Sequence, residues 1–341
     1  MFSHPVRRSE TPSETSLQQW ENCVSGSGLY CLYAFLWSKS AKGKDLTPLR
    51  GETMNPIKKH LPPGWLSDED RIIIQYEKKL GRIPDLKNPK RYTEKLQWYK
   101  LNYRDDRLTQ CADKYRVRDY ITQKGLSHIL IPLYGVYDSV DEIPFDALPD
   151  RFAMKANHAS GTNILCYDKK AFNEKEACKK GRQWLRRDFY KAGREWAYKN
   201  IKRRIVIEEL LIDRENETKS INDYKFLCLN GQVEYVLVDM DRFGSHKRNV
   251  YTPDWTFLDI RTNYPNCGDI IPKPENFEEM KDIAATLSAD FPHVRVDLYS
   301  VNGHTYFGEL TFYPWSGFVQ FTPDSLDFEL GEKLVLKGVR S

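Results

Sequence analysis

The sequence predicts an α+β protein in which a helical N-terminal region is followed by short strands. Residues 68–124 show the charged, apolar-periodic pattern of helices. After Ile131-Pro132 the chain alternates short apolar runs with turns rich in Pro, Gly, Asn and Asp. No internal repeat is present, which excludes a solenoid.

The composition is that of a folded, enzyme-sized chain. Its 341 residues suffice for two or three domains, and 40% hydrophobic with 29% charged residues argue against disorder of the bulk. A net charge of +4 is too small to indicate nucleic acid as a partner. Seven cysteines without a CxxC pair argue against a disulfide framework and indicate a reducing compartment. We therefore expect a cytoplasmic enzyme.

Four parts are expected along the chain: 1–53, 54–125, 126–204 and 205–341. The first is a leader, disordered or accessory, whose apolar run Gly28–Trp37 is shorter than the roughly 20 residues of a membrane-spanning helix. Export on a signal peptide is the less favoured reading, because the run starts late and the residues after it make a poor cleavage site. The second part is helical, and the last two contain the strands.

The individual elements follow from periodicity and capping. Ser67 to Asp70 is a helix start signal. The expected helices cover Asp68–Leu80, a segment starting at Thr93, Leu108–Ile121, Glu174–Tyr190 and Phe277–Phe291. The expected strands cover Phe152–Ala156, Asn163–Tyr167, Ile205–Leu211, Tyr224–Leu229, Val233–Asp239, Val294–Tyr299 and Thr305–Phe312.

The last two strands contain a candidate metal site. Alternation places Arg295 and Asp297 on one face of their strand. Asn302-Gly303 predicts a two-residue turn, but Glu309 reaches that same face only if the loop is odd in length or the hairpin contains a bulge. Two adjacent carboxylates suit Mg²⁺ together with substrate phosphates. The alternative is a solvated face on which Arg295 neutralises Asp297.

Further segments suggest phosphate and nucleotide contacts. The strand bearing Lys155 leads into a small turn at Ser160-Gly161, whose backbone N–H groups could approach phosphate oxygens. The strand from Ile205 ends in Glu208-Glu209, where a purine and its ribose could be bound at the strand edge. Each of these is also a common structural pattern.

A third group combines acids with a basic loop. Asp223 and Lys225 share one face of a strand that a turn at Asn230-Gly231 joins to the next. The polar stretch that follows suits an acidic substrate, although a charged loop is the commoner case. Its residues are Arg242, His246, Lys247, Arg248 and Asn249.

Taken in order, these segments resemble the ATP-grasp superfamily, and more narrowly its TupA-like branch, named for teichuronopeptide biosynthesis. The resemblance covers roughly Asp85 to the C-terminus. The segments that show it are Ala112–Ile121, Lys155–Asn163, Asp223–Phe226, Arg248–Tyr251, Val294–Tyr299 and Phe307–Pro314. It implies an ATP-grasp fold, with two α+β lobes clasping ATP after a helical N-terminal region. The N-lobe would be 126–204 and the C-lobe 205–341.

The resemblance also implies roles for single residues. The ATP-binding set would be Lys114, Lys155, Ser160, Gly161, Glu208, Glu209, Leu211 and Asp223. Asp297 and Glu309 would ligate Mg²⁺, Arg295 and Lys225 would act in catalysis, and Arg242, His246, Arg248 and Asn249 would bind substrate. The superfamily often has Asn where this chain has Thr311, and more Gly where it has Ala159.

The implied activity is an ATP- and Mg²⁺-dependent carboxylate–amine ligase that modifies a uronic-acid-containing surface polysaccharide or its precursor. Its partners would be a carboxylate substrate and an amine, with no nucleic acid, no transmembrane segment and a peripheral association with a polysaccharide assembly complex. One alternative is a glycosyltransferase using Asp239-Met240-Asp241 as its metal motif. Another is a non-catalytic ATP-binding scaffold.

Overall fold

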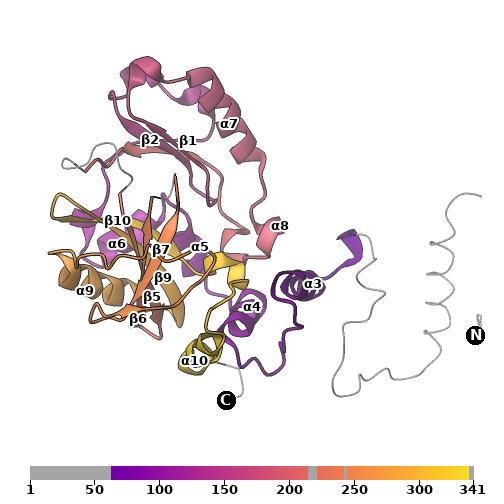
Figure 1. Cartoon of the computed structure of the whole chain (residues 1–341). Helices are drawn as coiled ribbons and strands as arrows, with labels where there is room; N and C mark the ends of the chain where they lie inside the picture. The colour runs from indigo at the N-terminus through magenta and orange to yellow at the C-terminus, as the bar shows by residue number, and fades with distance from the viewer. Residues whose placement is uncertain (1–62, 214–220, 242–243, 338–341) are drawn as a thin grey trace, which may run out of the picture. The chain divides into compact units, whose positions relative to one another are not determined.

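The computed structural model describes residues 63–213, 221–241 and 244–337, all of which belong to one unit, Met54–Ser341. They form a four-stranded and a six-stranded antiparallel sheet with helices packed around them (Figure 1). The predicted leader, 1–53, and the substrate-binding candidate Arg242 lie outside the described residues.

The described part of the chain begins with a short turn and four α-helices: α3 (Asp68–Leu80), α4 (Tyr92–Asn102), α5 (Asp106–Ala112) and α6 (Val117–Gln123). The predicted bounds of α3 are confirmed, and a capping box of Ser67 and Asp70 begins it. The prediction of one helix over Leu108–Ile121 is wrong. The Asp113 carboxylate accepts a hydrogen bond from the Tyr115 N–H at 2.9 Å, so a turn interrupts the helix there.

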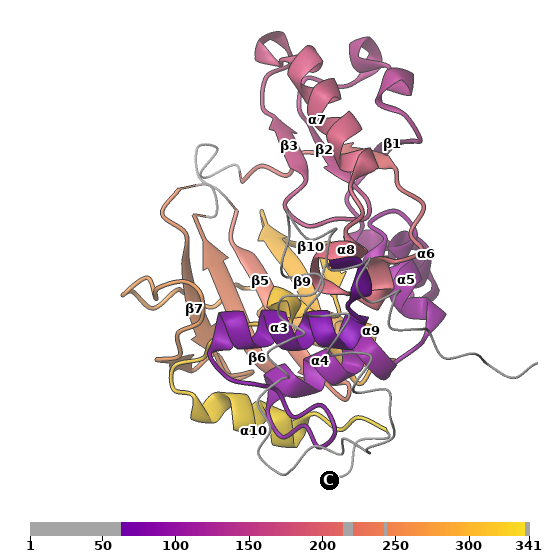
Figure 2. The same cartoon turned by 90° about the vertical axis from the view of Figure 1, so that its right-hand side faces the viewer.

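The smaller sheet has the strand order β1 (Leu133–Tyr137), β4 (Ile205–Glu209), β2 (Phe152–Ala156) and β3 (Asn163–Cys166). Helix α7 (Glu174–Arg186) packs on it, as both views show (Figures 1 and 2). Helix α7 ends at Arg186, four residues before the predicted end, and the short α8 (Tyr190–Gly193) follows.

The larger sheet has the order β10 (His304–Thr311), β9 (His293–Val301), β5 (Asp223–Leu229), β6 (Gln232–Met240), β7 (Lys247–Tyr251) and β8 (Phe257–Leu258). Helix α9 (Phe277–Ser288) packs against β5, β6 and β9, while α10 (Ser325–Lys333) packs against α4. Strands β1, β7 and β8 and helices α8 and α10 are not among the predicted elements. Short 3-10 turns cover Pro63–Trp65, Ser127–Ile129, Val140–Glu142, Phe145–Ala147, Lys169–Ala171, Trp196–Tyr198 and Pro314–Gly317.

The hairpin of β9 and β10 contains the two-residue turn, and of the two alternatives left open, an odd loop or a bulge, it has the bulge. Asn302 and Gly303 both have positive φ, as a two-residue hairpin turn requires. His304 lies opposite Val301, but the register shifts by one residue between Phe307 and Glu309. Gly308 is the extra residue, and a Cβ there would stand 2.9 Å from the Asp297 carbonyl oxygen.

The two faces of the six-stranded sheet differ in character. Alternate residues such as Phe226, Val296 and Leu298 are fully buried in the core that α9 covers. The residues between them, on the opposite face, are largely charged. In the described part of the chain, no helix is both long enough and apolar enough to cross a membrane.

Candidate active site

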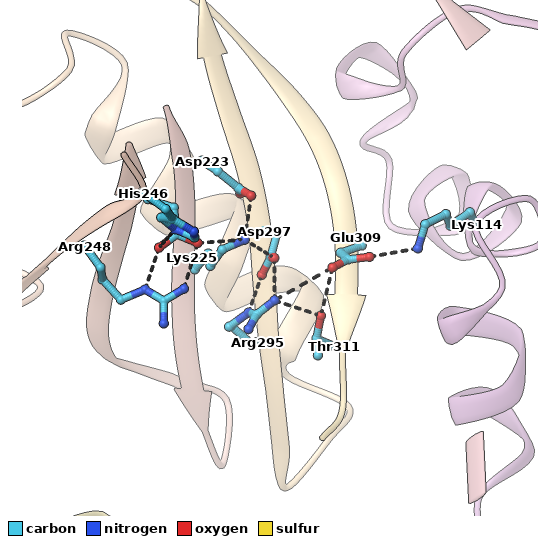
Figure 3. A network of polar contacts seen from close by, with 10 residues as sticks. Lys114, Asp223, Lys225, His246, Arg248, Arg295, Asp297, Glu309 and Thr311 are labelled. Carbon is cyan, nitrogen blue, oxygen red and sulfur yellow. Dashed lines mark hydrogen bonds and ion pairs between the residues drawn. The ribbon is translucent and has the colours of Figure 1, made fainter. Parts of the chain in front are cut away.

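The face of the six-stranded sheet away from α9 holds a network of charged side chains (Figure 3). Strand register creates it: Glu309 of β10 lies opposite Asp297 of β9, which lies opposite Lys225 of β5. Lys225 donates from Nζ to Asp297 Oδ2 at 2.6 Å. The prediction that Asp297 and Glu309 share one face is confirmed.

Arg295 connects the acids of this hairpin. Its Nε and Nη2 donate to the two oxygens of Asp297, both at 2.7 Å, and Nη2 also donates to Thr311 Oγ1 at 3.2 Å. The same Nη2 lies 3.8 Å from Glu309 Oε1. Burial alone would lower the pKa of Arg295, but the charge and hydrogen bonds of Asp297 raise it above its ordinary value. Arg295 is therefore a fixed cation.

Lys114 reaches the network from the turn between α5 and α6. Its Nζ donates to Glu309 Oε2 at 2.8 Å, and its backbone N–H donates to the Asn157 carbonyl oxygen at 3.0 Å. Burial would raise the pKa of Glu309, but Lys114, Arg295 and Lys225 outweigh it and lower that pKa. The Lys114 and Glu309 side chains are 19% and 32% exposed, against 2% for Asp297, so this end of the network is the open one.

The opposite end is closed around Asp239. Arg248 donates from Nε and Nη2 to the two Asp239 oxygens at 2.5 and 2.7 Å, and His246 Nε2 lies 3.3 Å from Oδ1. Lys225 links the two ends, because it also donates to Asp223 Oδ2 at 2.6 Å and lies 3.8 Å from Asp239 Oδ2. Burial would raise the pKa of Asp239, but Arg248 above all lowers it.

The network is electrically balanced. A buried charge needs a partner of opposite sign, because desolvation costs several kcal/mol for each ion. Leaving His246 aside, it contains four cations and four carboxylates: Lys114, Lys225, Arg248, Arg295, Asp223, Asp239, Asp297 and Glu309. This balance allows seven charged groups to share one face of a sheet with Lys114 beside them.

Trp315, which the sequence analysis missed, lies against this network. Its ring is 5.4 Å from Cζ of Arg248 and 6.0 Å from Cζ of Arg295, within the range of cation–π contact. It belongs to the turn after β10, where Trp315 and Ser316 both have positive φ, at 53° and 56°. The segment Pro-Trp-Ser-Gly, which begins three residues after the end of the last strand, was the available signal.

Two side chains of α4 hold this strained turn. Gln97 Nε2 donates to the carbonyl oxygens of Ser316 and Gly317 at 3.1 and 2.8 Å, and Lys100 Nζ donates to the Ser316 carbonyl oxygen at 2.7 Å. Burial lowers the pKa of Lys100 to about 7 and raises that of nearby Glu195. Residues in unfavourable φ regions persist where the surroundings fix them, as here.

The predicted substrate-binding residues do not form one open group. His246 stacks on Tyr264 at 3.6 Å between ring centroids and is 17% exposed. Arg248 is 4% exposed and held by Asp239, so it is not available to a substrate. Asn249 is fully buried, and its amide bonds to Cys267 and to the Asp269 carbonyl oxygen, which gives it a structural role instead.

The predicted residues of the smaller sheet form a separate group. Lys155 of β2 and Glu208 of β4 form an ion pair, and within the described ranges neither has an ion pair or hydrogen bond with the charge network. Ser160 and Gly161 lie exposed in the turn between β2 and β3. Of the remaining nucleotide candidates, Glu209 is exposed and Leu211 is partly buried after β4.

Asp297 and Glu309 are the carboxylates of the network that could hold Mg²⁺ together with nucleotide phosphates. Magnesium is bound by one or two carboxylates plus phosphate oxygens. The Glu309 side chain is partly exposed, whereas the Asp297 side chain is 2% exposed and already accepts bonds from Arg295 and Lys225. No three His, Cys, Asp or Glu side chains of the described residues come together as a metal-binding group. Glu309 is thus the more open of the two candidate ligands.

A protein-family model described as TupA-like ATPgrasp matches residues 94–335, more than two thirds of the chain. The solved structures similar to it include a D-alanine–D-alanine ligase from Bacillus anthracis (16% identity, 60% of this chain and 58% of that one, TM-score 0.36). Another is an L-amino acid ligase from Bacillus licheniformis (14%, 71% and 55%, TM-score 0.43). The chain thus spans less than two thirds of the length of either. No curated protein matches it in sequence. The family match confirms the expected ATP-grasp fold, and the chain belongs to the TupA-like ATP-grasp family.

Proposed function

We propose that this protein is an ATP-dependent carboxylate–amine ligase. The observation on which the proposal rests is the charge network around Asp297 and Glu309, with Lys114 and Arg295 at its accessible end. Membership of the ATP-grasp family supports the proposal that this group would lie beside the reacting phosphates of ATP. Fixed cations beside partly exposed carboxylates suit phosphoryl transfer, which depends mainly on positioning and electrostatics.

The reaction would proceed in two balanced steps. A substrate carboxylate oxygen attacks the γ-phosphorus of ATP, the bond to the β,γ-bridging oxygen breaks, and ADP leaves. An amine nitrogen then attacks the carbonyl carbon of the acyl phosphate, inorganic phosphate leaves, and the amine gives up a proton as the amide forms. Lys114 would exchange Glu309 for a phosphate oxygen, while Arg295 would face the acyl phosphate. Lys225 would hold Asp297 in place.

The remaining predicted contacts concern the nucleotide and the metal. Lys155 would contact the phosphates, and the Ser160-Gly161 turn would cover them. Glu309 and Asp297 would hold Mg²⁺, which when bound supplies positive charge beside the phosphate oxygens. Glu208 would bind the ribose after leaving its ion pair with Lys155.

The finer substrate assignment follows from the family. The TupA-like branch, named for teichuronopeptide biosynthesis, supports a uronic-acid-containing polysaccharide or precursor as the carboxylate and an amino acid or amine as its partner. This kind of assignment is an analogy between family members. We also place the protein in the cytoplasm, where ATP is available, in peripheral association with a polysaccharide assembly complex.

The geometry does not favour the glycosyltransferase alternative. Its metal motif would need both Asp239 and Asp241 to face one cation. Asp239 is occupied on both oxygens by Arg248, and Asp241 accepts a hydrogen bond from the Ser245 N–H at 2.7 Å. A scaffold without turnover would have no need for the balanced network.

One assay tests the proposal. The protein is incubated with ATP, Mg²⁺, galacturonate or glucuronate acceptors and mixed amino acids, and ADP and phosphate are followed. We expect ADP release that depends on both acceptor and amine, and its loss in Glu309→Gln but not in Glu332→Gln, an exposed acid in the last turn of α10. Release of UDP from a UDP-sugar would instead support the glycosyltransferase alternative. If neither ADP nor UDP is released, the non-catalytic scaffold is the alternative that fits.

A further inference from the structure

The positive charge of this chain is concentrated in one segment. Residues 174–204 contain twelve Lys and Arg against four Asp and Glu, a net charge of +8, whereas the whole chain has +4. The rest of the chain is therefore net negative. The segment covers α7 and the connection from α7 to β4. A local excess of this size is a physical argument for an anionic partner.

Helix α7 arranges part of this charge in a line. Lys175, Lys179, Arg182 and Arg186 are spaced by four, three and four residues, so they lie on one face of the helix, and all four are exposed. With a rise of about 1.5 Å per residue, successive cations stand about 4.5–6 Å apart along the axis.

The opposite face of α7 is closed against the smaller sheet. Ala177 and Gly181 are buried there. A Cβ at Gly181 would stand 2.5 Å from Val140 Cγ1 and 2.8 Å from Met154 Cε, so the helix lies against these side chains without spare room. An amphipathic helix that inserts into a membrane must free its apolar face. The apolar face of α7 is buried against the smaller sheet, so only its charged face can contact a partner.

The end of α7 brings further cations to the same place. Arg203 Nη1 donates to the carbonyl oxygens of Leu185 and Arg186, both at 3.3 Å, so the basic run before β4 lies beside the last turn of the helix. Lys202 and Arg204 share the single carboxylate of Asp138.

Within the part of the chain that the structure describes, two of the four aligned cations of α7 are ion-paired, and two are not. Arg182 pairs with Asp141 at 2.5 Å, and Lys179 lies 3.7 Å from Glu176. Lys175 and Arg186 have no acidic partner within 4 Å among the described residues. Lys175 and Arg186 can therefore bind an anion without first breaking an internal ion pair, whereas Lys179 and Arg182 would share theirs with the anion.

We propose that this surface, the basic ridge, binds a linear polymer of carboxylate-bearing sugars. We define the ridge by Lys175, Lys179, Arg182, Arg186 and Arg203. Regularly spaced cations match a chain with one carboxylate on each sugar, because their separation is comparable to the length of a pyranose ring. The acceptor of the reaction is then a polymer rather than a free monosaccharide, and this identity rests on the proposed function.

The test compares two variants of equal charge change. Lys175→Glu/Lys179→Glu/Arg186→Glu alters the ridge and leaves the Arg182–Asp141 pair intact. Lys87→Glu/Arg261→Glu/Lys337→Glu makes the same change at exposed cations elsewhere. Binding of the full chain to polygalacturonate is measured by calorimetry without ATP. Parallel titrations use galacturonate, phosphatidylglycerol vesicles or single-stranded DNA in place of the polymer. The neutral substitutions Lys175→Gln/Lys179→Gln/Arg186→Gln serve if the reversed variant does not fold.

We expect wild-type binding to polygalacturonate that weakens as salt is raised, and about tenfold or greater loss in the ridge variant only. Equal loss in both triple variants, or equal or stronger binding to vesicles or DNA, would overturn the proposal. The proposed function is tested separately by the ADP-release assay, and it fails if no acceptor causes release of ADP. If the protein ligates an amine to galacturonate but does not bind polygalacturonate, the proposed role of the basic ridge is refuted and the proposed ligase activity is not.

Discussion

Nζ of Lys114 lies 2.8 Å from Oε2 of Glu309, and this ion pair joins the turn between α5 and α6 to the last strand of the six-stranded sheet. Through its backbone N–H, Lys114 also contacts Asn157, just after β2. Both partners are partly exposed, and such pairs contribute at most about 1 kcal/mol. Lys114 can thus exchange its carboxylate for a phosphate oxygen at small cost.

Lys114→Met is the first variant that we would measure. We expect unfolding free energy within about 1 kcal/mol of wild type, because the lost pair is partly exposed. The ATP-dependent rate should fall about 100-fold, since a charge that stabilises the transferring phosphoryl group is removed. Lys124→Met is the control, because Lys124 forms a pair of equal length with Asp290 at similar exposure. Equal rates in the two variants would contradict the role of Lys114.

Asp297→Asn and Glu309→Gln should differ in stability although both remove a predicted metal ligand. The first leaves Arg295 and Lys225 buried with one carboxylate fewer, which we expect to cost about 3–5 kcal/mol. The second lies at the open end and should cost about 1 kcal/mol or less. Urea denaturation measures both. Equal midpoints would show that the network does not depend on Asp297.

Gly317→Ala tests the strained turn beside Trp315. Gly317 has φ of 66°, and a Cβ there would stand 2.4 Å from Gln97 Nε2. Gly303 has φ of 75° with nothing within 4 Å of its Cβ position, so Gly303→Ala measures the conformational cost alone, about 1 kcal/mol. We expect Gly317→Ala to be more destabilising by thermal unfolding and to lower the rate, because Trp315 contacts Arg295. Similar melting temperatures would exclude crowding at Gln97.

Stability should fall on acidification below pH 6.5 because of a buried histidine. Burial lowers the pKa of His293 to about 3, and its ring bonds to Tyr92 and to the Phe312 carbonyl oxygen. Between these pH values only the unfolded chain binds the proton, so this residue contributes a loss of about 1.4 kcal/mol per pH unit. Burial also lowers the pKa of His158, which adds to the slope.

Unfolding in urea at pH 6.5, 5.5 and 4.5 measures this slope, and His293→Asn isolates the part that His293 contributes. The amide can still donate to the Phe312 carbonyl oxygen but does not titrate. The variant should be less stable at pH 6.5 and show a shallower pH dependence. An unchanged slope would assign the effect to His158 or to carboxylates.

The hairpin of β9 and β10 could be predicted because its features are local. Alternation, an Asn-Gly turn and the need to bury Leu310 with Val296 leave a bulge as one of two solutions, and the structure contains it. Turn residues likewise predicted the hairpin of β5 and β6. At the break between α5 and α6 the Asp113 side chain accepts a hydrogen bond from the Tyr115 N–H, a local contact that periodicity does not detect.

Pairing between charges could not be predicted, because sequence tells which face a residue occupies but not which strand lies beside it. Arg248 is an example. As a basic residue in a polar stretch it suggested a substrate contact, yet strand order places it opposite Asp239, and the pair is buried. Strands β1 and β7 were missed for a related reason, since short strands gain most of their stability from neighbours.

The geometry of the site depends on the absence of a side chain at Gly308. Phe307 and Leu310, three positions apart, both face the core only because the strand takes up one surplus residue between them. In a straight ladder Glu309 would lie across from Val296, turned inward, without cations. In a Gly308→Ala variant the new methyl group would stand 2.9 Å from the Asp297 carbonyl oxygen. This crowding would destabilise the bulge and therefore favour the straight ladder. A sequence alignment or a redesign of this hairpin should therefore keep the number of residues between Phe307 and Leu310 first, because Glu309 faces the site only with that spacing.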